Sequence, residues 1–447
     1  MRTPAQGSTS RGIRVATALA ACALALIPWA AQAQTGTKTQ AQTGTAAQAA
    51  TKARAQTPWK LALPLSEAAS IDFMDVDARN RTDAWAVGRK TDDSFSAVPL
   101  AKRWDGKRWS DVRLAATGGR PAQLEAVAAS GPDDVWAAGT YTDVEIPSAA
   151  SARLPDRLAD RLPDSPSARS RDGAARPATA SPIVLQHWDG TRWKQVQRPA
   201  PAEGWIRFIG ELTSVGRDSV WLTTVDWNPV TGAYTGQLEQ WDGRTWRRTA
   251  LPPAPDGSPV EPWDITGTGP DDVWVTAESG TDGTATPLLY HFDGRRWTVD
   301  TIPVPDEYDA GWVANRIVTT KRGTVHVFGK TNDPGVPGAL LAARWDGRTW
   351  QPVPTPDIEE VNAAGVDGSG AVWIAGWPAG GNHAVLSRWD GASWTEEELP
   401  EEISTTVGSS LLGVDGVPGT RAVLAAGNVA CDSTTGACGL VVSRGIG

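Results

Sequence analysis

The stretch Arg103-Trp104-Asp105-Gly106-Lys107-Arg108-Trp109 decides the fold, because its pattern returns five more times along the chain. An aromatic-Asp-Gly triplet, with a tryptophan three residues after the glycine, recurs at Trp188–Trp193, Trp241–Trp246, Phe292–Trp297, Trp345–Trp350 and Trp389–Trp394. Successive copies lie 44 to 53 residues apart, except for one interval of 84 residues. A period of this length indicates a supersecondary unit that cannot bury its own apolar face and must pack against its neighbours.

A second phrase precedes each Asp-Gly hairpin and is typical of a short strand of alternating apolar residues. It runs from Asp83 to Gly88 in the first copy, and it returns around Trp136, Trp221, Trp274, His326, Trp373 and Leu424. Turn residues such as Gly131-Pro132-Asp133 come before it. Each unit is therefore predicted to have four strands, A to D. In the second copy we expect strand A at 124–129, B at 135–139, C at 183–188 and D from Trp193.

The two ends of the chain complete one another. Residues 440–445 match a C strand but no D strand follows, whereas residues 58–64 match a D strand with no A, B or C strand before it. We therefore expect the N-terminal strand to complete the last blade, which closes the ring and leaves no exposed sheet edge. The sequence predicts an all-β fold, a seven-bladed β-propeller of four-stranded antiparallel blades over residues 57–447.

The hairpin resembles the Asp-box, the Ser/Thr-x-Asp-x-Gly-x-x-Trp turn of bacterial neuraminidase repeats (BNR) and of propellers such as the photosystem II stability and assembly factor. The residue two before the aspartate departs from that pattern, being Arg103, His187, Gln240, His291, Arg344 or Arg388. With the strand phrase added, the pattern also resembles secreted repeat propellers of high-GC bacteria. The resemblance implies the fold and a structural role for the box, and it implies no activity. Neuraminidases carry an Arg-Ile-Pro segment, whereas Arg316-Ile317-Val318 lacks the proline.

The first 56 residues are predicted to lie outside the propeller. An apolar run from Val15, preceded by three arginines and followed by Ala31-Gln32-Ala33, is typical of a secretory signal peptide over residues 1–33. Residues 34–56 are rich in Gln, Thr and Ala, which favours a disordered linker. Leu19-Ala20-Ala21-Cys22 leaves a lipoprotein anchored through Cys22 as the alternative. We expect a secreted, extracellular protein with no transmembrane segment in the mature chain.

The net charge of the chain limits the classes of partner that it can bind. Removing residues 1–33 takes away three arginines and no acid, so the net charge changes from −9 to −12. An acidic surface disfavours nucleic acid and anionic membranes as partners. We expect a monomer whose partner is a carbohydrate or an envelope protein.

Two further features depend on the predicted export. Cys431 and Cys438 remain after the signal peptide is removed, and in an oxidising compartment we expect them to form a disulfide. The interval of 84 residues contains a low-complexity insertion over residues 142–181. For this insertion we expect disorder or a short fluctuating helix, with a lid over the ligand face as the alternative.

Tryptophan is the most unusual feature of the composition. Seventeen of the 22 tryptophans that follow the signal peptide fall in repeat columns, where packing between blades is a sufficient reason for them. Five stand outside the columns, in connections from D to A and from B to C or at the start of strand A: Trp205, Trp227, Trp263, Trp312 and Trp377. Both kinds of connection open on the face where propellers usually bind ligands. We interpret these rings as sites for stacking on a sugar, with loop packing as the alternative.

Strand A is expected to line a central channel. Aligning the copies places one residue of each strand on the channel side: Asp75, Ala126, Ser214, Asp264, Arg316, Ala363 and Gly413. Small residues are expected near a crowded axis, but Asp75, Asp264 and Arg316 are not. They are candidates for binding an ion or a polar ligand, and the alternative is a structural ion pair between Asp264 and Arg316.

These observations predict a secreted binding module whose ligand is a glycan or a cell-envelope partner on the face of the D-to-A and B-to-C loops. Loop carboxylates keep a carbohydrate hydrolase or lyase open as an alternative, although their separation is not set by the sequence; they are Asp306, Glu307, Asp309, Glu359, Glu360, Glu396, Glu397, Glu398 and Glu401. A structural or assembly factor is the third hypothesis. The spacing of the four histidines indicates no metal site, and no cofactor motif is present.

Overall fold

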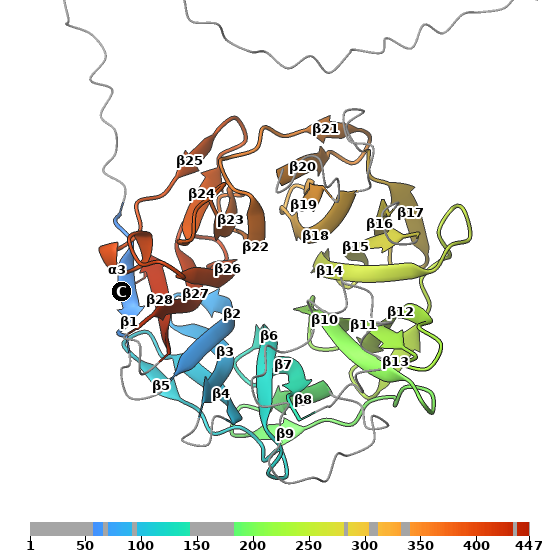
Figure 1. Cartoon of the computed structure of the whole chain (residues 1–447), viewed down its shortest axis with the longest axis horizontal. Coiled ribbons are helices and arrows are strands. Elements are labelled where there is room, and N and C mark those ends of the chain that lie inside the picture. The colour runs from blue at the N-terminus through green and yellow to red at the C-terminus, as the bar shows by residue number, and fades with distance from the viewer. Residues whose placement is uncertain are drawn as a thin grey trace, which may run out of the picture. The chain divides into compact units, whose positions relative to one another are not determined.

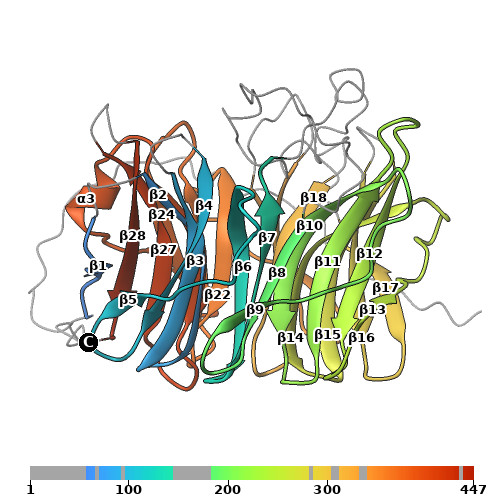
Figure 2. The ribbon, with the colours of Figure 1, turned by 90° about the horizontal axis from the view of Figure 1, so that it is seen from below.

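The computed structural model describes residues 57–65, 70–91, 96–143, 183–280, 285–303, 312–331, 340–431 and 436–446. Within these ranges the chain forms seven four-stranded antiparallel sheets, arranged as blades around a ring (Figure 1). Seen from the side, the strands of the blades stand roughly along the axis of the ring (Figure 2). The prediction of an all-β, seven-bladed propeller is confirmed. The signal peptide, the linker, Cys22 and residues 144–181 of the insertion lie outside the described residues.

Blades 1 to 6 each follow the chain from the innermost strand outwards, as the repeat predicts. Blade 1 comprises β2 (Ile71–Asn80), β3 (Asp83–Thr91), β4 (Ala97–Trp104) and β5 (Trp109–Asp111). Blade 2 comprises β6 (Ala122–Gly131), β7 (Asp134–Tyr141), β8 (Ile183–Trp188) and β9 (Trp193–Gln195). Blade 3 comprises β10 (Ile206–Ser214), β11 (Val220–Trp227), β12 (Tyr234–Trp241) and β13 (Trp246–Thr249).

The same order holds in blades 4 to 6, whereas the outermost strand of blade 7 is the N-terminal β1. Blade 4 comprises β14 (Val260–Gly269), β15 (Asp272–Ser279), β16 (Thr286–Phe292) and β17 (Trp297–Thr301). Blade 5 comprises β18 (Trp312–Thr319), β19 (Val325–Thr331), β20 (Leu340–Trp345) and β21 (Trp350–Pro352). Blade 6 comprises β22 (Glu360–Val366), β23 (Val372–Trp377), β24 (Val385–Trp389) and β25 (Trp394–Glu396). Blade 7 comprises β26 (Ser410–Gly416), β27 (Val423–Ala430), β28 (Ala437–Arg444) and β1 (Lys60–Leu63).

The N-terminal strand closes the ring, as the incomplete copies at the two ends predict. Strand β1 pairs antiparallel with β28, with Lys60 opposite Ser443. Trp59, just before β1, is 7% exposed and packs edge-on against Trp373 of blade 6, at 5.8 Å between ring centroids. Its indole N–H donates to Glu397 Oε2 at 3.3 Å. These contacts tie blade 7 to blade 6.

The Asp-Gly hairpin is held by its own aspartate. In blade 2, Asp189 Oδ1 accepts the backbone N–H groups of Thr191 and Arg192, both at 3.0 Å, while Gly190 has a φ of 91°. An aspartate that satisfies two backbone donors and a glycine that takes positive φ without strain make this turn from local chemistry alone. The aspartate makes the same pair of bonds in the other five hairpins.

The tryptophan columns interlock adjacent blades. Trp136 of strand B in blade 2 is 1% exposed and packs against Trp241 and Trp246 of blade 3, with centroids at 5.1 and 5.3 Å. Strand C of its own blade covers the same ring with His187, at 4.4 Å between centroids. His187 is one of the residues that depart from the Asp-box pattern. Arg103 lies over Trp85 and His291 stacks on Trp274 in the same way, so this position serves to cover the strand-B indole.

The structure also bears on the predicted disulfide and on the loop between blades 6 and 7. Cys431 and Cys438 form the predicted disulfide, with their Cα atoms 5.7 Å apart. A short helix, α3 (Glu401–Ser404), lies between blades 6 and 7, where only a loop was expected. Within the described ranges no helix has the length and apolar character needed to cross a membrane.

Candidate functional site

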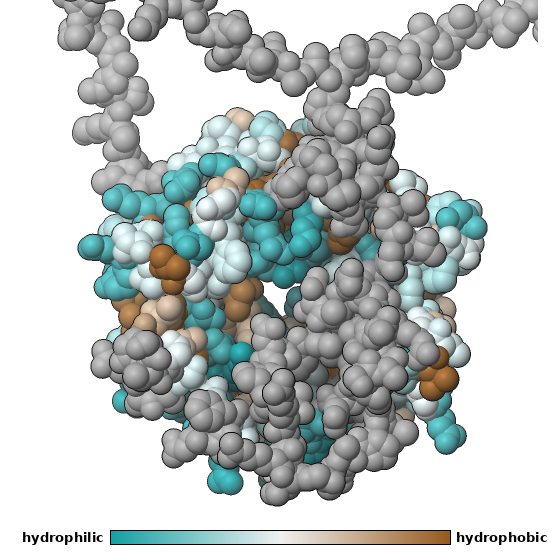
Figure 3. Space-filling view, viewed as in Figure 1, coloured by the Kyte–Doolittle hydropathy of each residue, from teal (hydrophilic) through white to brown (hydrophobic). Residues whose placement is uncertain are grey.

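The innermost strands enclose a central channel with a cavity volume of about 1240 Å³. The strands that line it are β2, β6, β10, β14, β18, β22 and β26. Figure 3 shows the opening of the channel near the centre of the ring, with hydrophilic side chains along part of its rim. This cavity exceeds the volume of ordinary small-molecule sites, so the channel is the main candidate for a binding site.

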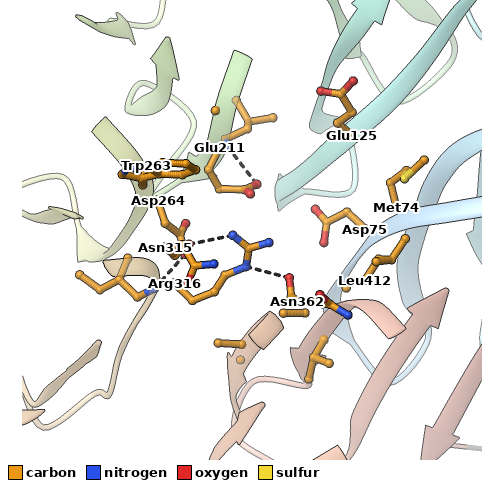
Figure 4. Close-up of a pocket in the computed structure, with 18 of the residues that line it drawn as sticks. Met74, Asp75, Glu125, Glu211, Trp263, Asp264, Asn315, Arg316, Asn362 and Leu412 are labelled. Atoms are coloured by element: carbon orange, nitrogen blue, oxygen red, sulfur yellow. Dashed lines mark hydrogen bonds between the residues drawn. The ribbon is translucent and has the colours of Figure 1, made fainter. Parts of the chain in front are cut away.

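Every innermost strand carries a bulge at the same register. In blade 1 the pairing shifts between Phe73 and Asp75, and in blade 5 it shifts between Ala314 and Arg316. An extra residue on one strand bends it and re-aims a side chain, here toward the channel (Figure 4). From the channel-lining residues that these shifts leave unpaired we take one large side chain per blade and call this set the bulge ring: Met74, Glu125, Glu211, Trp263, Asn315, Asn362 and Leu412.

Glu211 is a channel residue that the sequence alignment missed. Ser214 was expected at that position, but it pairs with Val220 at the far end of β10. The irregularity in β10 places Gly210 and Glu211 opposite Thr223, just as the one in β14 places Trp263 and Asp264 opposite Thr276, so Glu211 is the counterpart of Asp264 and the alignment was three residues out. A constant spacing was the available signal, because the channel residue stands ten positions before the strand-B aromatic in Asp75/Trp85, Glu211/Trp221 and Asp264/Trp274.

Asp75 and Asp264, both predicted to bind a ligand, each join two neighbouring blades. Asp75 Oδ2 accepts the backbone N–H of Val127 in blade 2 at 2.8 Å, and its Oδ1 accepts the N–H of Val76. Asp264 Oδ2 likewise accepts the N–H of Ile317 in blade 5 at 2.8 Å. Burial raises the pKa of Asp75 to about 7 and that of Asp264 to about 6. Both carboxylates therefore have a structural role, and ligand binding by them stays a prediction.

Two further aspartates make the same kind of link, and the sequence did not point to them. Asp77 accepts the N–H of Ala129 at 3.2 Å, and Asp415 accepts the N–H of Ala78 at 2.7 Å. Burial raises the pKa of Asp77 to about 7 and also raises that of Asp415. These bonds connect blade 1 to both of its neighbours, next to the place where the ring closes.

Arg316 does not form the ion pair that was considered for it. Its Nε donates to the backbone carbonyl of Asn362 and its Nη1 donates to that of Asn315, both at 2.7 Å (Figure 4). Within the described part of the chain, no carboxylate lies within ion-pair distance of its guanidinium. Its charge still lowers the pKa of Asp264 against the effect of burial. For Glu211, burial, together with the charges of the channel aspartates, raises the pKa well above its ordinary value.

The five tryptophans outside the repeat columns differ in their exposure and in the cavity that they line. Trp227 and Trp312 are 0% and 1% exposed, so neither ring offers a face to a ligand, and the packing alternative describes them. Trp205 is half-buried and lines neither cavity. Trp263 belongs to the bulge ring, and Trp377 is 37% exposed beside a second cavity of about 350 Å³. Ligand stacking stays a prediction for these last two.

The channel wall carries an excess of negative charge. Among the described lining residues there are nine carboxylates and three cations. The acids are Asp72, Asp75, Asp77, Glu125, Glu211, Asp264, Glu278, Glu360 and Asp415, and the cations are Arg89, Arg316 and Lys330. Burial raises the pKa of five of these acids, so part of the wall is protonated near neutral pH. The remaining carboxylates still outnumber the cations, and the wall therefore disfavours anionic ligands.

The other candidates from the sequence lie elsewhere. Asp306, Glu307 and Asp309 are outside the described residues. Glu397 is 9% exposed and binds Arg388 and Arg444, so it is part of the packing between blades. Among the residues with described positions, no group of His, Cys, Asp and Glu side chains is arranged to hold a metal ion.

Comparison with solved structures found chains of low sequence identity, each with a TM-score below 0.5. YCF48 bound to D1 peptide is 12% identical with a TM-score of 0.47, over 88% of this chain and 98% of that chain. A GH74 xyloglucanase from Xanthomonas campestris is 14% identical with a TM-score of 0.48, over 85% of this chain and 55% of that chain. The SapL1 lectin in complex with alpha methyl fucoside is 16% identical with a TM-score of 0.39, over 75% and 98%. No family model and no curated protein matches the chain.

Proposed function

We propose that the protein is a secreted binding module that takes up a neutral glycan in the central channel. The observation that carries this proposal is the bulge ring, which brings one indole together with amide and carboxyl groups on a single cavity wall. An indole can stack on the apolar face of a sugar ring, while amides and carboxylates can bind its hydroxyl groups. The same wall has few cations for an anionic ligand.

Asn315 supports the proposal at the level of a single atom. Its Oδ1 is buried in the channel wall and has no hydrogen-bond partner among the described residues. A buried acceptor without a partner is costly, so it calls for a donor such as a ligand hydroxyl or a water molecule. Asn315 is next to Trp263 around the ring, since the two belong to blades 5 and 4 (Figure 4).

Calorimetric titration of the mature protein tests the proposal. The probes are chito-, cello- and xylo-oligosaccharides, with a polyuronate as the anionic control. We expect a neutral probe to bind and the Trp263→Ala variant to bind it about tenfold more weakly, since one stacked ring is lost. Trp205→Ala removes an indole that lines neither cavity and should leave binding unchanged. If no neutral probe binds, or if Trp263→Ala binds as the wild type does, the proposal is wrong.

A carbohydrate hydrolase is the second candidate, and Glu211 favours it. Burial and the neighbouring aspartate charges raise the pKa of this carboxyl group, which is the property of a general acid. Hydrolysis also needs a second carboxylate, and Asp75 and Asp264 are already engaged with backbone N–H groups. Release of reducing sugar from the same oligosaccharides, abolished by Glu211→Gln, would favour the enzyme over the binding module.

Export is a separate part of the proposal. It predicts that the mature protein begins at Gln34, after cleavage of residues 1–33. Mass spectrometry of the exported protein distinguishes this from a lipid-modified N-terminus at Cys22.

A further inference from the structure

A second cavity adjoins the channel between blades 5 and 6. It is lined by the end of β19, the start of β22 and the end of β23, and its volume is about 350 Å³. Lys330 and Glu360 line both this cavity and the channel. Lys330 Nζ lies 3.2 Å from Glu360 Oε1, and both side chains are about two-fifths exposed, at 41% and 43%. The two cavities therefore meet at one solvent-accessible ion pair.

Trp377 lines this second cavity but not the channel. Among the described residues it is the aromatic side chain that stands out as exposed, at 37%. Its Nε1 donates to the Ser409 carbonyl at 2.9 Å, and its own carbonyl accepts the N–H of Glu359 at 2.8 Å. The N–H of the indole and the backbone are thus both fixed by the protein. An exposed ring held in this way loses little freedom when a ligand stacks on it.

We infer that the glycan is an extended oligosaccharide, with one sugar on the bulge ring at Trp263 and a later sugar on Trp377. This inference rests on the proposed function and assigns the second cavity as an outer subsite. The Lys330–Glu360 pair lies where both cavities meet, so its ammonium and carboxylate groups can bind hydroxyl groups of the sugars between the two rings. A monosaccharide can use only one of the two indoles. An oligosaccharide can use both.

The test is the dependence of affinity on chain length. Chito- and cello-oligosaccharides, from monosaccharide to hexasaccharide, are titrated calorimetrically against the wild type, Trp377→Ala, Trp377→Phe and the control Trp205→Ala. For the wild type we expect affinity to rise with length and then to level off once both rings are covered. Trp377→Ala should cost about tenfold for the hexasaccharide and leave the shortest binding probe unaffected. Trp377→Phe should recover part of the loss, because it keeps a ring at the site.

The possible outcomes separate this inference from the proposed function. If short and long probes bind equally well, or if Trp377→Ala binds the hexasaccharide as the wild type does, the outer subsite is refuted while the channel site stands. If Trp377→Ala weakens all lengths to the same extent, the ring acts through packing and the inference is again refuted. If neither series binds at all, the proposed function fails and the subsite fails with it.

Discussion

Replacing Trp59 by alanine is the sharpest test of ring closure. The side chain is 7% exposed, so folding buries on the order of 200 Å² of indole, or about 5 kcal/mol of transfer free energy as an upper estimate. Substitutions of buried tryptophan by alanine cost about 3–5 kcal/mol. The lost bond to Glu397 adds little, because Arg388 and Arg444 still bind that carboxylate. We therefore expect the free energy of unfolding to fall by about 4 kcal/mol.

Trp193→Ala is the matched control, since Trp193 stands at the start of the outermost strand of blade 2, as Trp59 does just before β1, and is 4% exposed. It packs on Trp85 and Trp188 at 5.3 and 6.1 Å, in a blade whose four strands follow one another along the chain. Both variants should lose similar stability in urea denaturation. Only Trp59→Ala should also raise amide hydrogen exchange in β1 and β28, because β1 is held to blade 7 through β28.

Two results would refute this reasoning. One is a loss below about 1 kcal/mol for Trp59→Ala, which would mean that the indole is not buried in the closing contact. The other is an unchanged exchange rate in β28, which would mean that the N-terminal strand does not complete the last blade.

Three further predictions concern the stability of the ring. Burial raises the pKa of Asp75 to about 7 and of Asp264 to about 6, so between about pH 4 and about pH 7 the folded chain holds protons that the unfolded chain releases. The free energy of unfolding should therefore fall as pH rises through this window. Urea denaturation midpoints at about pH 5 and about pH 7.5 check the sign of this change. A higher midpoint at the higher pH would contradict the prediction. His326 is 4% exposed, neither ring nitrogen has a partner among the described residues, and burial lowers its pKa to about 4. His326→Leu should raise the free energy of unfolding by about 1–3 kcal/mol, and a lower urea midpoint would show that the imidazole is satisfied after all. Reduction of the disulfide, or the Cys438→Ser substitution, should lower the free energy of unfolding by about 2.5 kcal/mol for a loop of this length. Urea denaturation with and without reductant measures this change. Equal midpoints would show that the disulfide does not form.

Much of the architecture followed from the repeat because its determinants are local. The turn at Asp189-Gly190 is made by bonds to residues only two and three positions away, so the hairpin can be read from a short stretch of sequence. The match between the incomplete end copies predicted the pairing of β1 with β28, because both segments carried the pattern of a known strand. The sequence showed that His187 replaces the Ser or Thr of the Asp-box. It did not show that this side chain covers Trp136.

The candidate site was less accessible to sequence reasoning. The bulges that place Glu211 and Trp263 on the channel shift the strand register by one residue, and such a shift changes which face a side chain takes. Trp227 and Trp377 looked equivalent along the chain, yet one is fully buried and the other is exposed. The links from Asp75 and Asp415 join residues 52 and 337 positions apart.

The sequence by itself determined the number of blades, their strand order and the closing strand, because each repeat encodes its own turns and apolar alternation. Only the tertiary structure decided which charged and aromatic side chains meet around the channel. The physical reason is that these side chains come from seven different blades, and their neighbours are set by ring geometry and bulge phase. The sequence of a single repeat specifies neither the ring geometry nor the position of the bulge.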